Sequence, residues 1–126
     1  MIYKFYDASG LINDKNNLFT NPEERIVVCS YTLNELSYTE TGYELYKYLI
    51  KNVNKFILYD VIPSIDNEIQ KVPLEIREHP ALLAAAIFDL TIHPDETVYV
   101  TGEKWLVPIA NLFFGEDSII YVEPTI

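Results

Sequence analysis

Three acidic residues, Asp7, Glu35 and Glu103, each follow a short apolar run. Asp7 comes directly after IYKFY, in the stretch IYKFYDASGL, and Glu103 lies just past TVYVT. Glu35 lies within a turn or two of the end of RIVVC. Carboxylates held close together repel one another and raise each other's pKa, so such a cluster persists most readily around a cation. Hard oxygen ligands suit Mg²⁺ or Mn²⁺, which activates water and neutralises a phosphodiester.

Five strand-like runs, with helical stretches between them, must position these acids. The runs are rich in β-branched and aromatic residues and are mostly continuously apolar, as in a parallel sheet covered on both faces. We expect helices at Thr32 to about Val53 (broken at Gly42), Ile65–Val72, His79–Leu90 and Pro108–Phe114. The strand-like runs are Ile2–Tyr6, Arg25–Cys29, Lys55–Tyr59, Thr97–Thr101 and Ser118–Val122. The alternation of strand and helix predicts an α/β fold with a mainly parallel, five-stranded sheet between helical layers.

The carboxyl ends of the predicted strands are the expected binding edge. In open parallel sheets, ligands bind beyond these ends, where the strand order reverses. We therefore expect Asp7, Glu35 and Glu103 to converge at one edge of the sheet.

Composition limits the classes of function. The 126 residues, 49% of them hydrophobic, fit a single domain spanning 1–126. A net charge of −10 argues against a protein that coats nucleic acid along a basic face. The same charge leaves room for an enzyme that binds a strand locally through metal ions, and it suits a basic protein partner.

The location expected from the sequence is the cytoplasm, away from the membrane. No apolar run reaches the ~18 residues of a membrane span. The first residues lack the pattern of a secretory signal. Cys29 is the only cysteine, which excludes an internal disulfide and fits a reducing compartment as a buried thiol.

Four motifs in order, FYDASGLI, VVCSYTLNEL, HPALLAAAIFDL and VYVTGEKWL, resemble those of PIN domains. This family includes the ribonuclease toxins of bacterial and archaeal toxin–antitoxin pairs. With FILYDVIPSIDNEI between the second and third motifs, the resemblance covers nearly the whole chain. It implies a three-layer α/β/α sandwich with strand order 3-2-1-4-5. It also implies Mg²⁺- or Mn²⁺-dependent hydrolysis of single-stranded RNA, an antitoxin or other protein partner, and often a homodimer.

The resemblance also implies roles for individual residues. Asp7, Glu35 and Glu103 match family acids and would be the catalytic and metal-binding residues. Ser9 and Thr101 match the accompanying hydroxyls and would contact substrate.

The family's remaining acid has no counterpart here, because Pro80 stands at the matching position. Proline cannot ligate a metal through its side chain, and Glu78 or His79 just upstream are the substitutes. Asp89 is too far along the same helix, about 13 Å from Pro80 at ~1.5 Å per residue.

Each acid also has a structural alternative. An acid that follows a strand, as Asp7 does, is often just a solvated loop residue. Glu35 lies three residues after Thr32, the spacing of a capping box at a helix start. Glu103 has Lys104 beside it and fits an ordinary surface residue.

Tyrosines and lysines gather in the stretch from Tyr38 to Lys55. Tyr38, Tyr43, Tyr46 and Tyr48 fit a subunit interface better than a platform for nucleobases.

Three hypotheses follow. The first is a metal-dependent single-stranded RNA endonuclease with an altered set of acids. The second is a catalytically degenerate PIN-like domain that binds protein or RNA. The third is a toxin whose activity requires a dimer or release from an antitoxin.

Overall fold

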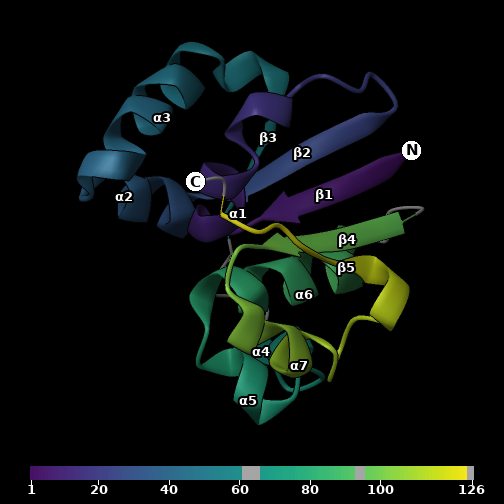
Figure 1. Cartoon of the computed structure of the whole chain (residues 1–126). Coiled ribbons are helices and arrows are strands. Elements are labelled where there is room, and N and C mark those ends of the chain that lie inside the picture. The colour runs from purple at the N-terminus through teal and green to yellow at the C-terminus, as the bar shows by residue number, and fades with distance from the viewer. Residues whose placement is uncertain (61–65, 93–95, 125–126) are drawn as a thin grey trace.

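A parallel sheet with strand order β3-β2-β1-β4-β5 organises the protein (Figure 1). The computed structural model describes residues 1–60, 66–92 and 96–124. Every strand pairing in these ranges is parallel, so the predicted fold class and strand order are confirmed. The strands are β1 (Ile2–Tyr6), β2 (Glu24–Cys29), β3 (Ile57–Tyr59), β4 (Glu96–Thr101) and β5 (Ile119–Tyr121).

Helices cover both faces of the sheet (Figure 1). One face carries α1 (Ala8–Asn13), α2 (Ser30–Ser37) and α3 (Glu40–Lys51). The other carries α4 (Asp66–Ile69), α5 (Leu74–Arg77), α6 (Pro80–Ile92) and α7 (Val107–Ala110). Short 3₁₀ turns are η1 (Lys15–Asn17), η2 (Val53–Lys55), η3 (Lys104–Leu106) and η4 (Glu116–Ser118).

Two apolar cores, one on each side of the sheet, explain the continuous apolar strands. Successive residues of β1 enter opposite cores, since Phe5 packs with the α5–α7 side and Tyr6 with the α1–α3 side. Helix α6 is buried on nearly all sides, as its alanine-rich sequence predicts. No helix within the described ranges is both long and apolar enough to cross a membrane.

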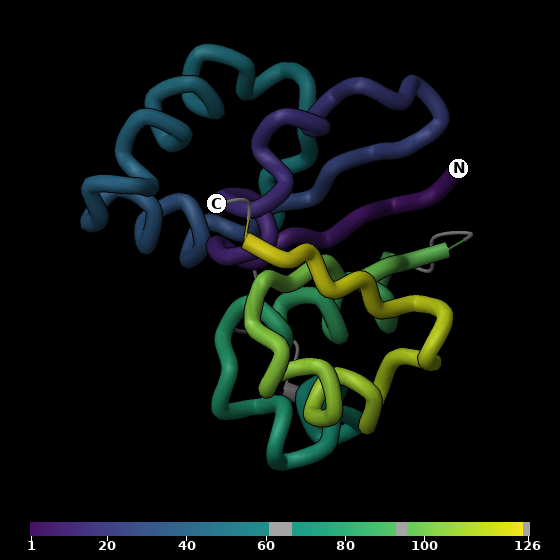
Figure 2. Tube along the Cα trace, in the orientation of Figure 1, coloured from purple at the N-terminus to yellow at the C-terminus, as the bar shows by residue number. Residues whose placement is uncertain are grey.

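The register aligns the carboxyl ends of the strands. Tyr6, the last residue of β1, pairs with Val28 of β2 and Val100 of β4. The first residues after these strands therefore meet at one edge of the sheet. The segment after β5 returns across the fold toward α1 (Figure 2), where the Asn13 amide donates to the Val122 carbonyl oxygen at 2.8 Å.

The helix expected from Thr32 to Val53 is two helices, and its predicted start and break were wrong. Helix α2 begins at Ser30, so Thr32 lies buried within it and does not cap it. The chain breaks before Glu40, where the Thr39 hydroxyl accepts a hydrogen bond from the Gly42 amide at 2.9 Å and caps α3. A Cβ at Gly42 would lie 2.8 Å from the Leu36 carbonyl oxygen, so glycine permits this close approach of α2 and α3.

Candidate functional site

Asp7 sits at the end of β1, and its carboxylate caps helix α1. Oδ1 accepts hydrogen bonds from the Gly10 amide at 2.7 Å and from the Ser9 hydroxyl at 2.9 Å. Oδ2 accepts from the Tyr99 hydroxyl at 3.1 Å, and only 6% of the residue is exposed. The solvated-loop interpretation of Asp7 is therefore wrong, because this carboxylate is buried and held by three donors.

The turn after Asp7 fastens α1 to strand β4. A Cβ on Gly10 would lie 2.5 Å from the Val100 carbonyl oxygen, so only glycine allows this packing. Ser9 Oγ accepts a hydrogen bond from the Gly102 amide at 2.9 Å while it donates to Asp7. The small residues of DASG thus allow the turn after β1 to pack closely against the end of β4.

Thr101, the second hydroxyl predicted to contact substrate, is fully buried. Its Oγ1 accepts a hydrogen bond from the Glu103 amide at 3.1 Å and lies 3.5 Å from Ser9 Oγ. Ser9 lines the pocket described below, whereas Thr101 is not among the pocket-lining residues. In this arrangement Thr101 positions the backbone that carries Glu103.

A pocket of about 300 Å³ brings the predicted acids together. Asp7 forms part of its buried wall, while Glu35 on α2 and Glu103 in the turn after β4 are exposed residues whose carboxyl groups are partly shielded from water at the pocket. The capping-box interpretation of Glu35 fails, because α2 begins before Thr32. None of the ion pairs found in the described ranges involves these three acids.

The pKa values show that these carboxyl groups interact. Burial raises the pKa of Glu35, and the negative charge of Asp7 raises it further. Burial likewise raises the pKa of Glu103, with Asp7 and then Glu35 adding to the effect while His79 opposes it. The charge repulsion expected of a carboxylate cluster is thus present at this edge of the sheet.

Pro80 lies in the pocket at the first position of α6. Glu78 and His79, the predicted substitutes for a missing acid, line the same pocket. Asp89, nine residues further along the chain, is not among the lining residues.

Two tyrosines in the pocket were missed by the sequence analysis. Tyr99 lies on β4 and donates to Asp7, and its pKa is raised well above 10.0, first by burial and then by Asp7, so the hydroxyl stays protonated. A buried tyrosine hydroxyl usually has a hydrogen-bond partner, so the sequence signals that Tyr99 has one without indicating which residue it is. Tyr31, at the start of α2, lines the pocket and is half exposed, and nothing in its sequence context marks it.

The pocket contains the types of side chain that bind a divalent metal ion, but these side chains do not form a metal-binding group in the described ranges. Carboxylate oxygens are suitable ligands for Mg²⁺ or Mn²⁺, and the His79 imidazole adds a nitrogen that Mn²⁺ accepts more readily than Mg²⁺ does. As the side chains stand, however, no three His, Cys, Asp or Glu residues in the described ranges form a group that could hold a metal ion. Asp7 is fixed by its donors, so Glu35 and Glu103, both exposed, are the side chains free to turn toward it.

Comparison with known proteins finds no matching family model and no significantly similar curated protein.

Proposed function

We propose that the protein is a metal-dependent endonuclease for single-stranded RNA with a PIN-like organisation and an altered acidic site. The observation that carries the proposal is the convergence of Asp7, Glu35 and Glu103 on one pocket, with raised pKa values for both glutamates. Capping α1 requires only Asp7. The two further acids facing it add repulsion without adding a structural contact, which is the usual mark of a functional site.

Asp7, Glu35 and Glu103 would hold the Mg²⁺ or Mn²⁺ ion. When bound, the ion supplies positive charge to a phosphodiester and lowers the pKa of water. Asp7 provides the fixed point of the site, because three hydrogen bonds hold its carboxylate. His79 provides a nitrogen donor beside the acids, which favours Mn²⁺ over Mg²⁺.

A second candidate function, a degenerate PIN-like domain that binds protein or RNA, is favoured by two observations. Pro80 lines the pocket at the position where the resemblance to PIN domains implies an acid. The Asp7 carboxylate already receives three hydrogen bonds, so it has less capacity for a metal than a free carboxylate.

Metal binding and cleavage separate the two candidates. We expect Mn²⁺ to raise the melting temperature more than Mg²⁺ does, because a ligand of the folded state stabilises it. We also expect slow Mn²⁺-dependent cleavage of single-stranded RNA.

The substitution Pro80→Asp restores an acid at a helix start, where a carboxylate is well tolerated, and should raise both Mn²⁺ affinity and cleavage. Leu112→Asp adds the same charge at an exposed position outside the pocket and serves as the control. A protein that shows neither a thermal shift nor cleavage, with or without Pro80→Asp, would be the binding module.

We further propose a homodimer, with an antitoxin or another basic protein as partner, in the cytoplasm. The outer face of α3 supports an interface: Tyr43 is half exposed, stacks on Tyr46, and has Lys47 5.2 Å above its ring. The net charge of −10 suits a basic partner, and the buried Cys29 thiol suits a reducing compartment. Sedimentation of the purified chain at micromolar concentration tests the dimer, and a monomer there would remove it.

A further inference from the structure

Two exposed aromatic residues follow the strands on either side of β1, the strand directly before Asp7 of the acidic pocket. Tyr31 follows β2 and is 48% exposed, and Trp105 follows β4 and is 58% exposed. Strands β2 and β4 are the two neighbours of β1 in the sheet. Because Asp7 follows β1, the two aromatic residues flank this carboxylate along the edge of the sheet.

Trp105 is held at the margin of the pocket by His79. The two ring centroids lie 5.5 Å apart with the planes inclined at 58°. His79 lines the pocket, as does Leu106, the residue after Trp105. The indole therefore has one neighbour within the pocket while more than half of its surface faces solvent.

The charge of the pocket indicates which part of a nucleic acid these rings would bind. The residues that line it include four carboxylates, Asp7, Glu35, Glu78 and Glu103, and no lysine or arginine, within the described ranges. A phosphate group alone is repelled by such a surface. Flat, uncharged nucleobases have no such penalty, and they stack on aromatic rings in unpaired strands.

We propose that Trp105, supported by His79, and Tyr31 are stacking sites for unpaired nucleobases on either side of the acids. This inference rests on the proposed nuclease function and specifies how its substrate is held. The backbone between the two stacked bases lies across Asp7, Glu35 and Glu103. Double-stranded nucleic acid does not bind in this way, because its bases are already stacked on one another.

The single tryptophan of the chain makes the proposal directly measurable, since all tryptophan fluorescence comes from Trp105. We expect single-stranded oligouridylate to quench this fluorescence in Ca²⁺ or in EDTA, and an abasic oligomer of equal length to quench it far less. Equal quenching by both oligomers, or none by either in both buffers, would overturn the stacking role. Quenching by an arginine-rich peptide and not by oligouridylate would also overturn it, in favour of a protein partner.

Binding of labelled oligouridylate, followed by anisotropy, provides a second readout. Trp105→Ala and Tyr31→Ala should each weaken binding about tenfold, the loss expected from one stacked base. Trp105→Phe keeps an aromatic face and should retain much of the affinity. Leu112→Ala is the control, because Leu112 is 53% exposed but lies outside the pocket. If neither alanine substitution changes the affinity for oligouridylate, the proposed stacking sites are contradicted.

The outcomes distinguish this inference from the function on which it rests. If the protein cleaves RNA with Mn²⁺, but its fluorescence and affinity are the same for oligouridylate and for the abasic oligomer, the stacking sites are overturned and the nuclease proposal stands. If the bases quench the fluorescence but no RNA is cleaved, the stacking sites are supported, and the RNA-binding module replaces the nuclease as the function.

Discussion

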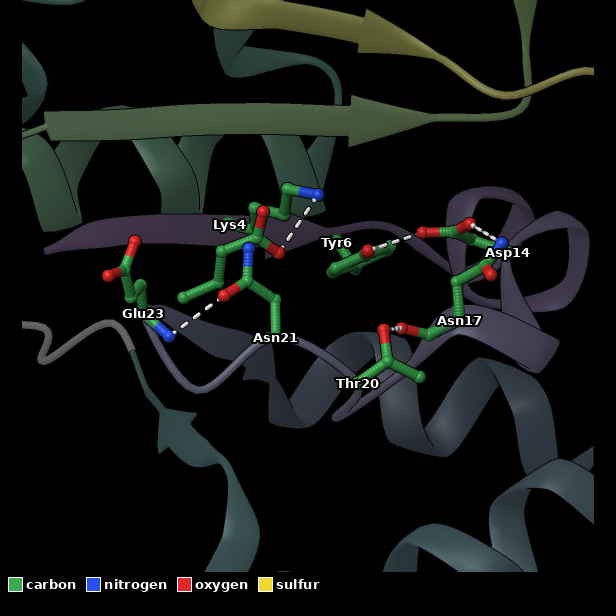
Figure 3. A network of polar contacts seen from close by, with 8 residues as sticks. Lys4, Tyr6, Asp14, Asn17, Thr20, Asn21 and Glu23 are labelled. Atoms are coloured by element: carbon green, nitrogen blue, oxygen red, sulfur yellow. Dashed lines mark hydrogen bonds and ion pairs between the residues drawn. The ribbon is translucent and has the colours of Figure 1, made fainter.

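Helix α1 has an aspartate at each end, and each aspartate accepts a hydrogen bond from a tyrosine. At the start of the helix, Tyr99 donates to Asp7 at 3.1 Å. At the end, Tyr6 donates to Asp14 at 2.5 Å, within the polar network of the following loop (Figure 3). Burial, with the adjacent carboxylate adding to it, raises the pKa of both tyrosines, so both hydroxyls remain protonated donors.

The surroundings of the two aspartates differ in charge. Asp14 also accepts from the Asn17 amide at 3.0 Å, an uncharged donor (Figure 3). Asp7 instead shares its pocket with Glu35 and Glu103, whose pKa values it raises. A carboxylate at a helix end can thus be held by a few uncharged donors alone, as at Asp14. The extra acids near Asp7 are beyond that need and support a role in binding or chemistry.

The largest expected difference between the two ends is in catalysis. Asp7→Asn should lower the proposed Mn²⁺-dependent RNA cleavage by about 100-fold or more, because the proposed metal site would lose an oxygen ligand and its charge. Asparagine caps helices as well as aspartate does, so the fold should persist. Asp14→Asn is the matched control and should leave the cleavage rate unchanged. Similar rates for wild type and Asp7→Asn would place the chemistry elsewhere.

A smaller difference is expected in stability when each tyrosine hydroxyl is removed. Tyr99→Phe should lower the free energy of unfolding by about 1.5–3 kcal/mol, since a buried carboxylate loses a donor. Tyr6→Phe should cost about 0.5–1.5 kcal/mol, because its bond to Asp14 is only partly buried. Urea denaturation of both variants measures this, and a larger loss for Tyr6→Phe would reverse the comparison.

Sequence alone predicted the scaffold of the site better than its contacts. The convergence of Asp7, Glu35 and Glu103 was predicted correctly, because parallel strands bring their carboxyl ends together at one edge of the sheet. The hydrogen bond from Tyr99 could not be predicted, because it depends on which face of β4 meets Asp7. The predicted start of α2 was wrong. Thr32 has the sequence pattern of a helix cap, but its side chain is buried within the helix and its hydroxyl lies next to the Cys29 thiol.

The smallest expected effect is in the pH dependence of stability. The pKa of folded Glu103 is raised above its ordinary value of 4.5, so the folded state holds this proton more tightly than the unfolded chain. Its stabilising contribution is full below pH 4.5 and is lost as the pH rises through the raised value. Glu103→Gln should therefore increase the free energy of unfolding at pH 7 and leave it nearly unchanged at pH 4.

Urea denaturation of Glu103→Gln at both pH values measures this effect. Glu116→Gln, at an exposed acid outside the pocket, is the control and should show no such gain. A loss of stability at pH 7 for Glu103→Gln would mean that this carboxylate makes a favourable contact.

The outer strands β3 and β5 limit how copies of this chain can associate. Each is only three residues long, although Leu58 and Ile120 at their centres are exposed. A short outer strand offers few free backbone groups for pairing with a strand of another molecule, which protects against amyloid-like aggregation. Assembly by extending the sheet is thereby disfavoured, and any stable contact between copies would have to use helical surfaces.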